Sequence, residues 1–277
     1  MSRSVPTVLK QFSPGKLYRE QKQDGPQKVS AVIITYNEEQ NIHRTLSRLT
    51  WCDEIVILDS YSNDKTIDIC KEAGCKIFYR SFDGYGTQKQ AAVAKASNDW
   101  VLVVDADEVL SEELVHEIQD AVSGNTDHAA FSIPMNLVFL NKEFKVGREA
   151  NRYYIRLFNR RRGGFTADKV HEGIVVDGPV RKFRSTIKHY SYTSLHQCIE
   201  KCNKYSTLSS EMAFRKGKNK SVLVLLMSLP FNFFKYYLLD LNFMNGLKGF
   251  YWSVFSTYYH FAKYVKLNEL NGVRKIR

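Results

Sequence analysis

The stretch VSAVIITYNEEQNIHRTLSRLTWCDEIVILD, residues 29–59, decides the fold of this chain. It begins and ends with a short, continuous apolar run, and the segment between them has its apolar residues at helical spacing. The alternation continues through CKIFYR, TQKQAAVAKAS, WVLVVD and SEELVHEIQDAVSG. Apolar strands separated by amphipathic helices are typical of a parallel sheet that is covered on both faces. We therefore expect an α/β fold whose ligands bind beyond the carboxyl ends of the strands.

The pattern changes after residue 125. Shorter, mixed segments such as AAFSIPMNLVFL, YYIRLFNRRRGG, VHEGIVVDGPV and STIKHYSY predict an antiparallel addition to the sheet. The last eighty residues have helical patterns rich in aromatic side chains. We predict a basic tail over residues 1–28, a ligand-binding α/β domain over 29–195 and a helical region over 196–277.

The charge balance favours a polyanionic partner. Forty Lys and Arg against 29 Asp and Glu give the 277-residue chain a formal charge of +11. Residues 148–188 include 11 basic and four acidic side chains. A phosphorylated substrate, an anionic lipid surface or a nucleic acid would suit this charge. The five cysteines form no CxxC pair and the first residues have no apolar leader, so we expect a cytoplasmic protein with reduced thiols.

The apolar C-terminal segment is too short to cross a membrane. Its uncharged run, residues 221–234, has 14 residues and contains Pro230, whereas a spanning helix needs about 20 apolar residues. Aromatic faces with nearby lysines are typical of helices that lie in the interface of an anionic membrane. Those lysines are Lys235, Lys248, Lys263 and Lys266. Packing of these helices on the first domain is the alternative.

The first two strands end in polar loops, TYNEEQN and DSYSNDKT. Neither loop contains the GxGxxG that a dinucleotide fold places after its first strand, which disfavours a nicotinamide enzyme. Asp59, at the tip of the second strand, can accept hydrogen bonds from a ribose or a base. Asp64 is expected to cap the helix that follows.

The fourth strand ends in VLVVDADEV, which contains a DxD motif. Side chains alternate along a strand, so we expect Asp105 and Asp107 to point the same way. Two converging carboxylates repel each other unless a cation lies between them. Oxygen ligands select Mg²⁺ or Mn²⁺, and such an ion would bridge a diphosphate.

The ordered set of motifs resembles family 2 glycosyltransferases. The set comprises TYNEE, DSYSNDKT, GTQKQAAVAKASNDWVLVVDADE, RLFNR, VHEG and KHYSY, and the likeness covers about residues 29–267. The similarity is greatest to the subgroup that adds sugars to the lipopolysaccharide inner core, represented by its β-1,4-glucosyltransferase. Gln90 departs from the pattern, because asparagine is expected after QK.

The resemblance implies a GT-A-type, Rossmann-like nucleotide-sugar-binding domain and a metal-dependent, inverting transfer. A UDP-sugar is the implied donor and a lipopolysaccharide-core or lipid-linked glycan the implied acceptor, at the inner face of the cytoplasmic membrane and without nucleic acid. Seven residues would bind the nucleotide sugar, namely Thr35, Tyr36, Glu38, Asp59, Lys89, Asp105 and Arg156. Asp105 with Asp107 would hold the metal.

Direct displacement needs a general base that accepts the proton of the acceptor hydroxyl. Glu172 in VHEG is the predicted base, with Asp168 and Glu108 in reserve; a surface glutamate paired with Arg181 or Arg184 is the alternative. His189 is predicted as a third metal ligand or a diphosphate contact, although an isolated histidine is often a core residue. Arg156 is predicted to reach the diphosphate. The run Arg160, Arg161 and Arg162 either faces solvent or meets a phosphorylated acceptor.

Two other functions have to be weighed. VVDADEV also matches the nucleophile loop of haloacid-dehalogenase-type phosphatases, but that loop follows the first strand, and this chain has no later GDxxxD. A non-enzymatic basic protein that binds nucleic acid or membrane would explain the charge. The chain, however, has no zinc spacing, helix-turn-helix or RNP aromatic pattern.

Overall fold

The computed structural model describes residues 27–124, 126–166, 173–219 and 221–276. The chain divides into two compact units: the first contains the described residues up to Pro134 together with Tyr153–Ile187, and the second contains Met135–Arg152 and the residues from Lys188 onward. The segment 135–152 is thus grouped with the C-terminal helices, whereas the predicted domain boundary at residue 195 stays a prediction. The predicted tail over 1–28 lies almost wholly outside the described residues.

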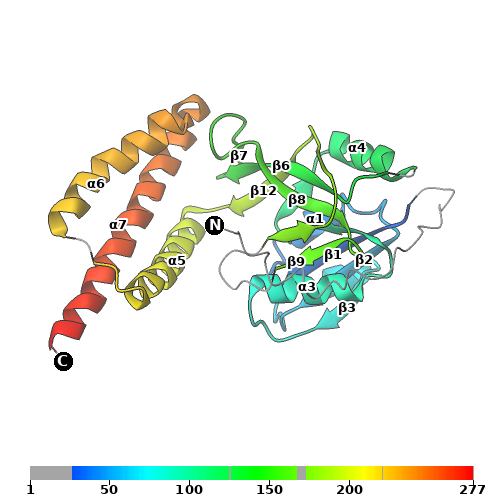
Figure 1. Ribbon diagram of the computed structural model, residues 1–277, viewed down its shortest axis with the longest axis horizontal. Helices are drawn as coiled ribbons and strands as arrows, with labels where there is room; N and C mark the ends of the chain where they lie inside the picture. Colours follow the sequence, from blue (N-terminus) through cyan, green and yellow to red (C-terminus); the bar gives the residue numbers. More distant parts are fainter. Residues whose placement is uncertain (1–26, 125, 167–172, 220, 277) are drawn as a thin grey trace, which may run out of the picture. The chain divides into compact units, whose positions relative to one another are not determined.

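The four predicted strands of the first unit form a parallel half-sheet, with β1 in its centre (Figure 1). In the order β3-β2-β1-β4 they are Lys76–Tyr79, Glu54–Asp59, Val29–Thr35 and Trp100–Val103. The register pairs Thr35 of β1 with Asp59 of β2, and Val32 of β1 with Val103 of β4. The carboxyl ends of β2 and β4 therefore flank the end of β1, as the sequence predicted.

The rest of the sheet continues from β4 in the order β8-β6-β12-β5, and β7 and β11 pair with β6. These strands are Glu108–Leu110 (β5), Ala130–Phe139 (β6), Lys142–Glu143 (β7), Arg152–Asn159 (β8), Val180–Lys182 (β11) and Ile187–Tyr192 (β12). A separate antiparallel pair consists of β9 (Gly163–Phe165) and β10 (Ile174–Val176). The predicted antiparallel addition is confirmed, since β8 runs antiparallel to β4 and β7 to β6; β11, however, pairs with β6 in parallel.

Helices cover both faces of the parallel strands because successive strand residues point to opposite sides. The four helices are α1 (Ile42–Leu46), α2 (Thr66–Glu72), α3 (Tyr85–Lys95) and α4 (Glu112–Val122). On one face, α1, α2 and α4 bury Ile42, Cys70 and Leu114 in the cluster that contains Ile33 of β1. On the other face, α3 packs against β1 and β2 (Figure 1), and its Val93 joins Val32 in a second cluster.

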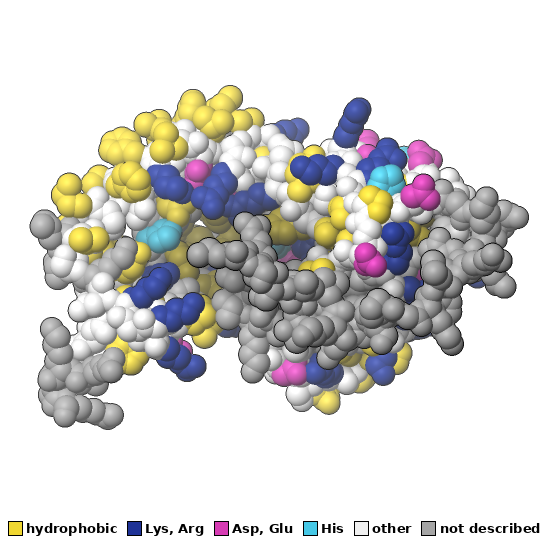
Figure 2. All heavy atoms as spheres, in the orientation of Figure 1, with side chains coloured by type: hydrophobic (Ala, Val, Ile, Leu, Met, Phe, Trp, Pro, Cys, Tyr) yellow, Lys and Arg dark blue, Asp and Glu magenta, His cyan; other side chains and the backbone are white. Residues whose placement is uncertain are grey.

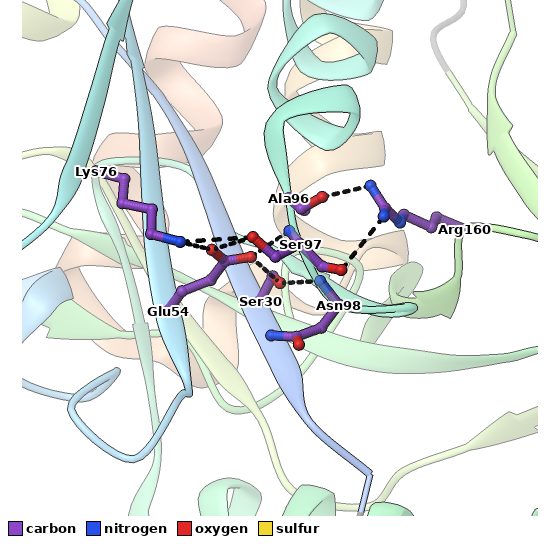
Figure 3. Close-up of polar contacts among 7 residues, drawn as sticks. All are labelled: Ser30, Glu54, Lys76, Ala96, Ser97, Asn98 and Arg160. Carbon is purple, nitrogen blue, oxygen red and sulfur yellow. Dashed lines mark hydrogen bonds and ion pairs between the residues drawn. The ribbon is translucent and has the colours of Figure 1, made fainter. Parts of the chain in front are cut away.

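A buried polar network ties the amino ends of the strands together, at the edge opposite to the expected ligand site (Figure 3). Glu54, the first residue of β2, accepts hydrogen bonds from Ser30 of β1 (2.5 Å), from Lys76 of β3 (2.6 Å) and from the Ser97 backbone N–H. Burial raises the pKa of Glu54, but these donors outweigh burial and lower the pKa to about 2. This network fixes three strands and the turn before β4.

The second unit is built mainly from helices: α5 (Leu195–Arg215), α6 (Val222–Phe234), the π-helical turn η2 (Lys235–Leu239), the 3₁₀ turn η3 (Asn242–Asn245) and α7 (Gly246–Ile276). Both α5 and α6 pack along α7 (Figure 1). Small buried side chains, Ser206 and Ser210 of α5 and Ser253 of α7, occur on these helices. Across the pair, the Lys266 ammonium donates to Asn203, Ser206 and Thr207. None of the described helices is long and apolar enough to cross a membrane.

Candidate active site

The loops that follow β1 and β2 hold each other in place. The Asn37 N–H donates to Ser62 Oγ (2.8 Å), and the Asn63 N–H donates back to Asn37 Oδ1 (2.9 Å). The N–H of the next residue, Glu38, donates to Thr66 Oγ1 (2.7 Å). Because side chains satisfy these backbone donors, TYNEE and DSYSNDKT form one structured rim at the carboxyl edge of the sheet. The loop after β1 ends at Asn41, and α1 begins at Ile42.

Asp59, the last residue of β2, accepts hydrogen bonds from residues of this rim. Its side chain is fully buried. One oxygen accepts from Thr35 Oγ1 (2.8 Å) and from Ser62 Oγ (2.6 Å), and the other accepts from the Ser62 N–H (2.7 Å). The predicted neighbours Thr35 and Asp59 are thus brought together, and both are engaged with protein groups. A contact of Asp59 with a ribose or base stays a prediction.

Asp64 was expected to cap α2, but the N-cap position is Lys65, which makes no side-chain cap bond, and Asp64 anchors the helix from the residue before it. Its Oδ1 accepts from the Thr66 N–H (3.0 Å) and from the Thr66 hydroxyl (2.5 Å), while Oδ2 accepts from the Glu39 N–H (3.1 Å). The carboxylate therefore links the helix to the loop after β1.

Exposed tyrosines stand on the same rim. Tyr36, directly after β1, is 59% exposed, and Tyr61, in the loop after β2, is 60% exposed. Tyr61 has a φ of 64°, a left-handed conformation that is uncommon for a bulky residue. Its ring stacks on that of Tyr79 with centroids 5.9 Å apart. The rim thus presents flat aromatic surfaces of the kind that stack with a base or a sugar ring.

The carboxyl end of β4 carries a chain of buried ion pairs. Asp105 Oδ1 lies 2.8 Å from Lys89 Nζ of α3, and Oδ2 lies 3.2 Å from a guanidinium nitrogen of Arg156 on β8. The same nitrogen of Arg156 also contacts Glu108 Oε1. Burial acts to lower the pKa of Arg156, but the charges of Glu108 and Asp105 outweigh it and raise the pKa above its usual value. Two cations of this group are therefore fixed beside the first aspartate of the DxD motif.

The DxD motif lies in a turn, which corrects the strand argument made from the sequence. β4 ends at Val103, and the Glu108 N–H donates to the Asp105 carbonyl (3.0 Å), which closes a turn over residues 105–108. A second bond, from the Asp105 N–H to Glu108 Oε2 (2.9 Å), tightens it. Strand alternation therefore does not set the directions of Asp105 and Asp107. Both side chains are half-buried at the carboxyl edge of the sheet.

The donor set suits a hard divalent cation. Mg²⁺ is usually held by one or two carboxylates together with water and substrate phosphates, and Asp105 with Asp107 offers two carboxylates. In the part of the chain that the structure describes, no group of three His, Cys, Asp or Glu side chains could hold a metal ion. His189 lies on β12 in the second unit, and its predicted role as a ligand stays a prediction.

The predicted base and its reserves have different outcomes. Glu172 and Asp168 lie outside the described residues. Glu108 is fully buried and ion-paired with Arg156, so in this structure it cannot reach an acceptor hydroxyl. Arg156 itself is 8% exposed, and its Nε has no hydrogen-bond partner among the described residues. Contact between Arg156 and a diphosphate stays a prediction.

The basic run after β8 is structural. Arg160 donates to the Ala96 and Ser97 carbonyls at the end of α3 (Figure 3). Arg161 pairs with Asp99 (2.7 Å), and Arg162 donates to the Asp177 carbonyl (3.0 Å). A cation at a helix carboxyl end stabilises the helix dipole. Of these contacts only that between Arg161 and Asp99 joins opposite charges, and a contact of the run with a phosphorylated acceptor stays a prediction.

Several residues of the site were not identified from the sequence. Gln88 of α3 is fully buried and donates to Ser60 Oγ and to the Arg80 carbonyl, both at 3.1 Å, which anchors α3 behind the rim. Gln90 accepts from the Phe165 N–H of β9 (2.8 Å), so the residue that departs from the family pattern ties α3 to β9. The two serines and the threonine of DSYSNDKT were a visible signal, because hydroxyl groups in a loop commonly satisfy backbone donors.

The fold and this edge define a class of protein: a parallel α/β half-sheet that ends in hydroxyl, aromatic and carboxylate side chains, with fixed cations beside the carboxylates. The family model described as glycosyl transferase family 2 matches residues 30–204. The chain belongs to this family and is a glycosyltransferase.

Curated relatives agree with this assignment. An uncharacterised glycosyltransferase of Rickettsia typhi is 30% identical over 260 residues, which cover 88% of each chain. The lipopolysaccharide core biosynthesis glycosyltransferase LpsC of Rhizobium meliloti is 29% identical over 253 residues, covering 89% of this chain and 94% of the relative. Among solved structures, the glucosyl-3-phosphoglycerate synthase from Mycobacterium tuberculosis, in complex with Mn²⁺, UDP and glucosyl-3-phosphoglycerate, is 20% identical. It matches with a TM-score of 0.35 over 39% of this chain and 44% of that chain, a likeness from which nothing about this chain is inferred.

Proposed function

We propose that this glycosyltransferase moves a hexosyl group, glucose in the first instance, from a UDP-sugar to a lipopolysaccharide-core or related lipid-linked glycan. The transfer is metal-dependent and inverts the anomeric carbon. The likeness to the core glycosyltransferase of Rhizobium meliloti supports the acceptor class. The β-1,4-glucosyltransferase subgroup rests on the sequence motifs alone. The enzyme carries out this transfer at the inner face of the cytoplasmic membrane.

One observation carries the donor side of the proposal: Asp59 ends β2 and Asp105 lies in the turn after β4, the two strands that flank β1, and Asp105 is held between Lys89 and Arg156. The rim with Tyr36 and Tyr61 lies over β1 and β2, where a base and ribose would bind. The cations lie at the end of β4, where a diphosphate would bind. A nucleotide diphosphate has this same order, an aromatic ring followed by negative charge.

The chemistry follows from that order. Asp105 and Asp107 would hold Mg²⁺ or Mn²⁺, which supplies charge neutralisation for the departing nucleoside diphosphate. Lys89 adds a fixed positive charge next to the leaving group, in a position that costs no reorganisation during the reaction. The Glu172 carboxylate accepts the proton of the attacking acceptor hydroxyl, and Glu38 and Thr35 shape the nucleotide side of the pocket.

The first test is a screen of nucleotide sugars for thermal stabilisation and turnover, with and without Mn²⁺. UDP-glucose with Mn²⁺ is expected to raise the Tm and to support transfer to lipopolysaccharide core acceptor. Asp107→Ala should abolish turnover with the fold intact, whereas the exposed Asp68→Ala of α2 should leave it unchanged. Full activity of Asp107→Ala with Mn²⁺ present would show the metal assignment to be wrong.

The second test concerns the base. Glu172→Gln should lower kcat at least ~100-fold with little change in donor affinity, because a base acts on the acceptor proton and not on donor binding. Weaker donor binding at unchanged kcat would contradict that role and would favour a surface glutamate.

A further inference from the structure

A stripe of large apolar side chains runs along the exposed side of α6 and η2. Its members are Met227, Phe231, Phe234 and Leu238, which are 66%, 65%, 57% and 47% exposed. Their spacing of four, three and four residues places them on one side of a helix. A helix that packs only against its own protein usually buries such a stripe.

A second stripe lies on the start of α7. It consists of Leu247, Phe250, Val254 and Tyr258, which are 39–64% exposed and spaced by three, four and four residues. Since α6, η2 and α7 pack against one another, the two stripes belong to neighbouring elements of the same unit. Figure 2 shows hydrophobic side chains gathered over α6 and the turn into α7, with Lys and Arg side chains beside them. We call these two stripes the apolar face.

The charges beside the apolar face are almost all positive. The segment 221–267 contains four lysines and a single acid, Asp240. Lys235 lies 3.4 Å from the Asp240 carboxylate, and Arg148 lies 3.8 Å from it. One acid is thus shared by two cations, and the Arg148 side chain is 52% exposed. A second acid, Glu149, interacts with Arg148 and pairs with Arg152 (3.1 Å), so three cations stand against two acids and the group keeps one net positive charge.

Backbone contacts hold Arg148 next to Asp240, although the two residues are more than 70 positions apart in the sequence. The Arg148 N–H donates to the Asp240 carbonyl (3.1 Å), and Asn245 Nδ2 donates to the Val146 carbonyl (3.0 Å). Gly147 has a φ of 86°, and a Cβ at this position would lie 2.2 Å from the Asp240 carbonyl oxygen. Only glycine permits this approach. Lys266, which the sequence suggested as a membrane contact, is instead used to join α7 to α5.

We propose that the apolar face, with Arg148 and Lys235 at its margin, is a docking surface for the interfacial region of an anionic phospholipid bilayer. In the interfacial region of the bilayer the apolar side chains are removed from water, and the cations contact lipid phosphates. A second copy of the chain fits the apolar face less well. A self-complementary contact would bring the cations of both copies together, and the Asp240 carboxylate of each copy already contacts two cations. The proposal deepens the proposed function by naming the surface that brings the enzyme to a lipid-linked acceptor, and it stands on the second unit alone.

The test is co-sedimentation of the full chain with vesicles of phosphatidylcholine alone or with 30% phosphatidylglycerol. Wild type is expected to bind the anionic vesicles at least ~10-fold more tightly, and less tightly as salt is raised. Phe231→Asp with Leu247→Asp should weaken binding at least ~100-fold, and Arg148→Gln with Lys235→Gln should remove most of the preference for anionic lipid. Leu208→Asp, at an exposed position of α5 away from the face, is the matched control.

Far-UV circular dichroism and Tm of each variant confirm folding, and light scattering gives the oligomeric state. Unchanged vesicle binding by the folded Phe231→Asp, Leu247→Asp variant would overturn the proposal. A wild-type dimer that this variant converts to monomer, with no vesicle binding by either, would assign the face to a second copy instead. UDP-sugar hydrolysis without acceptor is expected to be the same in wild type and variant, so loss of catalysis and loss of docking are measured separately.

Discussion

Acidification should destabilise the first unit through Glu54, and the size of the effect can be worked out from the structure. The pKa of this carboxyl is lowered from 4.5 to about 2 because three donors outweigh the effect of burial. A group whose pKa is lowered by folding adds stability above its unfolded pKa, and this stability is lost as the pH falls toward the folded pKa. Lowering the pKa from 4.5 to about 2 corresponds to about 3 kcal/mol at pH 7, of which about 1.5 kcal/mol remains at pH 3.

Other carboxylates titrate over the same range, so the measurement is the difference between wild type and Glu54→Gln. Urea unfolding is followed by tryptophan fluorescence in a Trp252→Phe background, in which Trp51 and the buried Trp100 report on the first unit. The difference in free energy of unfolding should shrink by about 2 kcal/mol between pH 7 and pH 3. Glu112→Gln, which removes an exposed ion pair with Arg48, is the control and should change stability by less than about 1 kcal/mol. A constant difference between wild type and Glu54→Gln across this range would refute the assigned pKa.

Three further predictions follow from the ion pairs and thiols. Arg156→Met should lower the free energy of unfolding by about 3–5 kcal/mol, because it leaves the buried Glu108 without its cation. A double variant that also carries Glu108→Gln should recover part of this loss in a double-mutant cycle measured by urea unfolding. Additive effects of the two substitutions would argue against the ion pair. Lys266→Met should cost about 1–3 kcal/mol in the same assay, because the oxygens of Asn203, Ser206 and Thr207 lose their shared donor, and an unchanged Tm would show that the contact between α5 and α7 does not depend on it. Iodoacetamide at pH 8 should label Cys75 before Cys70 in the native protein, as read by mass spectrometry, because hydrogen bonding between the two thiols raises the pKa of Cys70 and lowers that of Cys75; the reverse order would contradict this assignment.

The parallel half-sheet was predictable from the sequence because its signals are local. Each of VSAVIIT and EIVILD is a continuous apolar run of strand length, and the polar residues at their ends had to meet at one edge of the sheet once the strands were parallel. The register then places Thr35 beside Asp59, as expected. The role of Asp64 at the start of α2 was predictable in kind, since its bond to the Thr66 N–H is local, although the N-cap position itself is Lys65.

Partners distant in sequence were not predictable. The expected contact of Arg156 with a diphosphate stays a prediction. Its buried pair with Glu108, 48 residues earlier, was not predicted, because it depends on β8 lying antiparallel beside β4. The arginine run was expected either to face solvent or to meet a phosphorylated acceptor, and its contacts with the end of α3 and with Asp99 were not predicted. A charged side chain shows its charge in the sequence, but whether that charge is already neutralised depends on what the fold brings to it.

The sequence by itself determined the α/β class, the order of strands and helices, the polar edge that holds the candidate active site and the absence of a long apolar helix among the segments we weighed. Tertiary structure alone decided that the DxD motif lies in a turn, that Asp105 is fixed between Lys89 and Arg156, and that Arg148 stands next to Asp240. The physical reason is one of range. Periodicity and capping depend on neighbours along the chain, whereas ion pairs and exposed faces depend on which distant elements pack together.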